Sequence, residues 1–223
     1  MKLFKNIKNW LENQEHLFYL FLFILIVPNM VLCFTEPLPF MAKVANVLLP
    51  FGCYYLLMTL SRNCGKMLWI LFLFLFFGAF QIVLLYLFGQ SIIAVDMFLN
   101  LVTTNSSEAL ELLDNLTPAI IAVIILYVPA LILGTISIIR KRKLTVEFIR
   151  RERKRAFLVF GISLLSLVGA YVQDSGYELK SDLYPLNVCY NVGLAFQRTA
   201  LTQDYHRTSK DFTFHARPTH PEG

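Results

Sequence analysis

The sequence predicts an all-α, polytopic membrane protein built as a bundle of five transmembrane helices. Hydrophobic residues make up 57% of the 223 residues and the mean hydropathy is +0.58, which exceeds what a soluble core requires. Five stretches approach or exceed the length of about 20 mostly apolar residues that a membrane-spanning helix needs. Most of the loops between them are short. These three observations together define the fold class.

The predicted spans form one membrane domain over residues 1–173. They cover residues 16–34, 44–60, 67–88, 117–139 and 156–172. Pro28 in the first span and Pro50 in the second predict kinks, whose freed backbone groups neighbouring helices must satisfy. Between the third and fourth spans we expect an external amphipathic helical segment over residues 91–114.

Basic residues orient this bundle, because short loops rich in Lys and Arg stay on the cytoplasmic side. Fourteen of the 20 Lys and Arg lie before the first span, in the loop with Arg62 and Lys66, and in residues 140–155, whereas residues 89–116 carry none. We therefore expect a cytoplasmic N-terminus, with residues 89–116 and everything after the fifth span outside. The net charge of +5 indicates contact with anionic lipid headgroups and requires no nucleic acid.

Residues 174–223 are polar and mixed in charge, and we expect them to form an external connector. Pro185 can open a short helix as its first residue. Residues 185–198 have a roughly apolar side that suits a helix lying in the outer membrane interface. From Thr199 onward the sequence predicts an extended linker, so the chain is expected to stop just before a further domain.

No catalytic or metal-binding constellation is evident in the sequence. Catalysis requires a nucleophile with its activating base, or three to four metal ligands within reach. The chain has no H-E-x-x-H, G-x-S-x-G, P-loop or dinucleotide motif. The histidines His206, His215 and His220 fall in the predicted linker, where a polar tail is the ordinary interpretation. We therefore predict no catalytic residue, metal ligand or cofactor in this chain.

The polar segment "NLVTTNSSEALELLDNLTP" holds the candidate binding residues. Asn100, Thr104 and Glu108 recur at i, i+4 and i+8. In one continuous helix they share a face about 12 Å long, because each step of four residues advances about 400°. An amide and a hydroxyl can hydrogen-bond phosphate or glycerol oxygens, and a carboxylate can pair with a primary ammonium. A zwitterionic phospholipid headgroup offers that combination.

A capping box is the alternative role for the same segment. Asn105 would serve as the N-cap, and Glu108, three residues later, would bond back to the Asn105 backbone N–H. A helix would then start at Asn105, and the carboxylate would need no ligand. Spacing alone leaves both roles open.

The chain resembles the membrane half of the bacterial phosphoethanolamine transferases, enzymes that modify lipid A and confer polymyxin resistance. The resemblance rests on "FLNLVTTNSSEALELL", on the basic internal loop and fifth span that follow, and on "YPLNVCYN", and it covers essentially the whole chain. In that family the Asn, Thr and Glu of this spacing contribute to the site for the phosphatidylethanolamine donor. They match Asn100, Thr104 and Glu108, so the resemblance favours the ligand role.

The resemblance also implies a two-step transfer in which this chain would take only part. In the family, a threonine in a sulfatase-like domain accepts phosphoethanolamine with the aid of zinc and passes it to a phosphate on lipid A or a related periplasmic glycan. This chain would bind the donor and anchor that domain at the bacterial inner membrane, with its C-terminus periplasmic, and would be inactive alone. The alternatives are a small membrane carrier or a lipid-binding anchor without catalysis.

Overall fold

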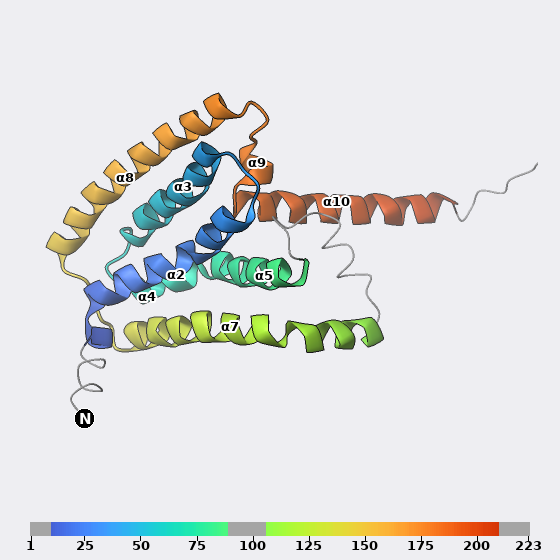
Figure 1. The fold of residues 1–223 in the computed structure, drawn as a ribbon. Coiled ribbons are helices and arrows are strands. Elements are labelled where there is room, and N and C mark those ends of the chain that lie inside the picture. The colour runs from blue at the N-terminus through green and yellow to red at the C-terminus, as the bar shows by residue number, and fades with distance from the viewer. Residues whose placement is uncertain (1–9, 89–105, 210–223) are drawn as a thin grey trace, which may run out of the picture.

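The computed structural model of the chain describes residues 10–88 and 106–209. All regular elements within these ranges are helices, which confirms the all-α prediction. Figure 1 shows them as an elongated bundle from which one helix projects. The helices are α2 (Gln14–Thr35), α3 (Phe40–Met58), α4 (Cys64–Ile70), α5 (Phe72–Phe88), α7 (Ser106–Ile139), α8 (Val146–Gln173), α9 (Leu179–Asp182) and α10 (Leu186–Ser209).

Four of these helices, α2, α3, α7 and α8, are long and apolar enough to cross a membrane, and the bent pair α4–α5 raises the number to five. Polytopic membrane character is therefore confirmed for the described residues. Helix α2 is the most buried of the four and α8 the least. The main apolar core forms around Phe18, Phe21 and Met58, which are fully buried, and α3 packs between α2 and α8.

The third predicted span is not one straight helix. The sequence predicts a continuous helix over residues 67–88, whereas α4 and α5 meet at Leu71 with a bend of 63°. Kinks without proline arise where a side chain engages the backbone ladder. Here the Tyr184 hydroxyl, from the connector, donates a hydrogen bond of 2.9 Å to the Phe74 carbonyl in the first turn of α5. The bend thus accompanies a contact between segments distant in sequence.

Helix α7 is longer than the predicted fourth span. It runs unbroken for 34 residues, and its membrane-spanning part, Thr117–Ile139, has the predicted bounds. The separation expected between an external segment ending at residue 114 and this span is absent, because the helix continues through Pro118. A proline removes one backbone hydrogen bond, and membrane helices tolerate this loss. Residues 106–116 and the membrane-spanning part therefore form one continuous helix, and residues 91–105 of the predicted segment lie outside the described residues.

The connector also differs from the prediction. Helix α10 does not stop at residue 198 but continues to Ser209, so the extended linker predicted from Thr199 is wrong for residues 199–209. The Thr199 and Thr202 hydroxyls donate to the carbonyls four residues earlier, each at 2.9 Å, which is compatible with a helix. Pro185 precedes the helix rather than opening it, since its carbonyl accepts the Cys189 N–H at 3.3 Å.

Candidate functional site

The predicted donor-binding residues lie mostly beyond what the structure describes. Asn100 and Thr104, and the alternative N-cap Asn105, fall outside the described residues, whereas Glu108 lies in α7 with its side chain undescribed. Glu108 lies nine positions before Thr117, the first residue of the membrane-spanning part. At 1.5 Å per residue, this distance is roughly 13 Å along the helix axis. Glu108 therefore extends beyond the apolar span on the same rigid helix.

A cluster of buried polar side chains ties the connector to the bundle on the side where α10 departs. We name Asn29, Asn46, Tyr177, Tyr184 and Asn187 the connector node; each is at most 7% exposed. The Asn29 side-chain amide donates to the backbone carbonyls of Asn46 at 2.9 Å and Tyr184 at 2.8 Å. One asparagine on α2 therefore links α3 to the segment before α10.

Asn46 forms the second half of this link. Its amide donates to the Asp182 carbonyl at 2.5 Å, and its side-chain oxygen accepts the Tyr177 hydroxyl at 2.5 Å. Burial raises the pKa of the Tyr177 phenol above its ordinary value, so the hydroxyl remains protonated and acts as a donor. The amide nitrogen and the amide oxygen of Asn46 thus both form hydrogen bonds with the connector.

Tyr184 reaches from the connector into the bundle, where further polar groups gather. Its hydroxyl and that of Tyr127 both lie within 3.3 Å of the position that a Cβ on Gly78 would occupy. Within the described residues, the hydroxyls of Tyr54 and Tyr127 and both polar atoms of the Asn187 side chain have no hydrogen-bond partner, although all are buried. Unpaired buried groups of this kind are suited to bind a water molecule or a polar ligand atom.

Sequence reasoning did not predict the connector node. The polar residues Asn29 and Asn46 inside otherwise apolar spans were the available signal, because polar side chains within the membrane are costly and need partners. The partners themselves come from residues 131 to 155 positions away, which no local pattern indicates.

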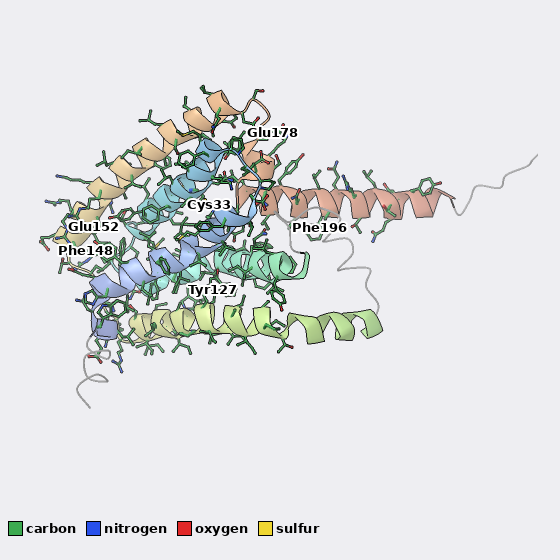
Figure 2. All side chains as sticks on the ribbon, in the orientation of Figure 1. Cys33, Tyr127, Phe148, Glu152, Glu178 and Phe196 are labelled. Carbon is green, nitrogen blue, oxygen red and sulfur yellow. The ribbon has the colours of Figure 1, made fainter. Side chains whose placement is uncertain are left out.

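Figure 2 shows Tyr127 within the bundle and Phe196 on the projecting part of α10.

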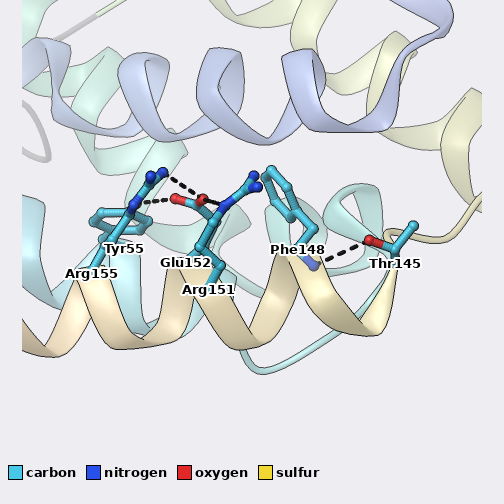
Figure 3. A network of polar contacts seen from close by, with 6 residues as sticks. All are labelled: Tyr55, Thr145, Phe148, Arg151, Glu152 and Arg155. Carbon is cyan, nitrogen blue, oxygen red and sulfur yellow. Dashed lines mark hydrogen bonds and ion pairs between the residues drawn. The ribbon is translucent and has the colours of Figure 1, made fainter.

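The opposite end of the bundle carries a second polar network, centred on Glu152 in the first turns of α8 (Figure 3). Glu152 is fully buried. Its carboxylate accepts hydrogen bonds from Arg151 Nε and Arg155 Nη1, each at 2.9 Å, and from the Tyr55 hydroxyl of α3. Phe148, one turn earlier, is 2% exposed and packs edge-on against Phe18. The predicted internal loop over residues 140–155 is thus helical from Val146 onward and attached to α3.

We expect Glu152→Ala to lower the free energy of unfolding by about 2 kcal/mol, chiefly because the buried Tyr55 hydroxyl loses its acceptor. Arg151 and Arg155 are more than half exposed, so the loss of their ion pairs contributes little. Unfolding of the purified protein in mixed micelles by SDS titration measures this change. Glu147→Ala, an exposed carboxylate on the same helix, is the control and should change stability by less than about 0.5 kcal/mol. Equal losses would rule out a stabilising role for the network.

Within residues 10–88 and 106–209, no three His, Cys, Asp or Glu side chains are grouped so that they could hold a metal ion. No protein-family model, curated protein or solved structure matches this chain, so its function is inferred from its own residues and the sequence resemblance.

Proposed function

We propose that this chain is the membrane domain of a bacterial phosphoethanolamine transferase, an inner-membrane enzyme that moves phosphoethanolamine from phosphatidylethanolamine to lipid A or a related periplasmic glycan. Asn100, Thr104 and Glu108 bind the donor headgroup. The amide and hydroxyl hydrogen-bond the phosphate and glycerol oxygens, and the carboxylate pairs with the primary ammonium. Zinc and the nucleophile belong to a sulfatase-like domain outside this sequence.

The observation that carries the proposal is the continuity of α7 between Glu108 and the membrane span. A helix of 34 residues is about 51 Å long, which exceeds the hydrocarbon thickness of about 30 Å. Its excess length lies on the Glu108 side, since the apolar part is Thr117–Ile139. This geometry supports a carboxylate at or just above the outer headgroups, where a lipid ammonium is accessible.

The connector supports the anchoring half of the proposal. Helix α10 projects from the bundle in the same direction as the Ser106 end of α7 (Figure 1), and the connector node fixes its base. A domain carried by such an arm stays near a lipid held at α7. Tethering then replaces a bimolecular encounter with a high effective concentration.

Removal of the Glu108 charge tests the proposal directly. We expect Glu108→Gln to weaken binding of phosphatidylethanolamine at least tenfold, since a hydrogen bond to a charged group contributes about 1.5–3 kcal/mol. Native mass spectrometry of the purified chain with added phosphatidylethanolamine measures the affinity. Phosphatidylcholine is the second probe, because its quaternary ammonium has no N–H to donate. The wild type should prefer phosphatidylethanolamine, and Glu108→Gln should lose that preference.

Asp114→Asn is the matched control, because it also removes one negative charge from α7. Asp114 lies six residues after Glu108, which places it about 120° away around the helix, on a different face. We expect Asp114→Asn to leave the affinity unchanged. Equal weakening by the two variants would reject a specific donor site at Glu108. A capping role predicts a different outcome, in which Glu108→Gln leaves phosphatidylethanolamine binding intact and also keeps the helix content measured by circular dichroism, because Gln can take the place of Glu in a capping box.

A further inference from the structure

The first turns of α8 carry two basic faces that differ in their partners. On one face, Arg151 and Arg155 share an ion pair with the single carboxylate of Glu152. On the other, Arg150, Arg153 and Lys154 form no ion pair with any described residue. On this second side, which we call the uncompensated face, the basic side chains have no acidic ion-pair partner among the described residues.

A groove of about 480 Å³ lies along this uncompensated face. Arg62, from the loop between α3 and α4, joins the three α8 side chains at its edge. Backbone contacts hold two of the four basic side chains: Arg62 Nε donates to the Leu144 carbonyl at 2.9 Å, and Arg153 Nη2 donates to the Thr59 carbonyl at 2.7 Å. These contacts position the guanidinium groups without cancelling their charge.

Val146, Ile149 and Phe157 give the same groove an apolar lining. Phe157 is 60% exposed, and Leu165 and Val168 further along the same side of α8 are 72% and 60% exposed. Between them lies Gly161, where a Cβ would meet no atom within 4 Å. The charged groove thus continues into an open apolar stripe at helical spacing.

The dimensions of the stripe match one lipid leaflet. The eleven steps from Phe157 to Val168 rise about 16 Å along α8, which is close to half of the hydrocarbon thickness of about 30 Å. The charged end lies at the level of the basic loops, at the surface where anionic lipids attract Lys and Arg. A molecule that fills both parts carries a negative headgroup and at least one long acyl chain.

We propose that this face of α8 is a binding site for an anionic phospholipid of the inner leaflet. Arg62, Arg150, Arg153 and Lys154 hold the headgroup phosphate, and the acyl chain lies along Phe157 and Gly161. The site is at the opposite end of the bundle from Glu108 and does not depend on the donor site proposed above. Glu147 borders a neighbouring groove that shares Arg150 and Lys154, and it forms an ion pair with neither.

The double variant Arg150→Gln, Lys154→Gln tests the site, because both side chains are exposed and orphan no carboxylate when neutralised. Native mass spectrometry of the full chain with added phosphatidylglycerol measures the affinity. We expect a loss of roughly thirtyfold, because each of the two basic residues contributes about 1 kcal/mol near an anionic lipid surface. Binding of phosphatidylethanolamine should change less than threefold.

The double variant Lys141→Gln, Lys143→Gln is the matched control, since it removes two exposed positive charges from the same end of the bundle, outside the groove. It should lower phosphatidylglycerol affinity less than threefold. Equal losses in the two double variants would overturn the proposal in favour of diffuse attraction to charge. Displacement of the lipid by millimolar inorganic phosphate would also overturn it, since the acyl chain would then add nothing to binding.

Discussion

Gly65→Ala is expected to destabilise the protein by about 3 kcal/mol or to prevent its folding, because the new methyl group would overlap with the backbone of another helix. A Cβ on Gly65 would lie 2.2 Å from the carbonyl oxygen of Gly134 and 2.9 Å from its carbonyl carbon. A flexible side chain could move away, but a helical backbone cannot move alone. Helices α4 and α7 would have to separate.

Such a separation would break hydrogen bonds at the adjacent end of the bundle. The Asn63 amide, at the N-terminus of α4, donates to the carbonyls of Ser137 at 3.1 Å and Arg142 at 2.9 Å. SDS-induced unfolding, or the yield of monodisperse protein in detergent, measures the effect. Gly161→Ala is the control because its Cβ would face open space. It should stabilise α8 slightly through helix propensity. A wild-type stability for Gly65→Ala would contradict the close packing of α4 and α7.

Asn46→Leu is expected to release the connector from the bundle. The substitution leaves the Tyr177 hydroxyl and the Asp182 carbonyl without their partner, and each buried group left unpaired costs about 1–3 kcal/mol. Hydrogen–deuterium exchange should therefore increase over residues 174–188, whereas the amides of α2 near Phe18 and Phe21 keep their protection. The Asn29 amide keeps its bond to the backbone carbonyl at position 46, so the damage is local.

Tyr177→Phe serves as the graded control for this release. It removes the hydroxyl and keeps the ring, which packs edge-on against Tyr171 at a centroid distance of 5.4 Å. In Tyr177→Phe we expect about half of the increase in exchange over residues 174–188 that Asn46→Leu causes, because only one of the two hydrogen bonds of the Asn46 side chain is lost. Unchanged exchange over residues 174–188 in Asn46→Leu would mean that the connector is held by its apolar contacts alone.

The sequence was sufficient to predict those parts of the fold that depend on apolar length. The membrane-spanning part of α7 coincides with its prediction, and α2 extends the predicted first span by a few residues at most. The bend at Leu71 was not predictable, because it accompanies a hydrogen bond between residues 110 positions apart. Helix α10 was underestimated because its second half is polar, and polar composition does not by itself exclude a helix.

For the candidate sites too, local sequence patterns were predictable and contacts between distant residues were not. Asn100, Thr104 and Glu108 were recognised by spacing and resemblance, and two of the three lie outside the described residues. The burial of Glu152 was not predicted, because a run rich in arginine indicates a solvated loop until the packing of Tyr55 from α3 is known. Likewise, spacing does not indicate which basic residues have an ion-pair partner, since Arg62 joins the groove from a separate loop.

The length of α10 sets the working radius of anything attached to it. Its 24 residues measure about 36 Å at 1.5 Å per residue, and its base is immobilised by the connector node. A small tilt of α10 about its base at Leu186 therefore displaces Ser209, at the far end of the helix, by a large distance. Because Asn29 and Asn46 hold its base, α10 acts as a stiff arm and not as a flexible linker.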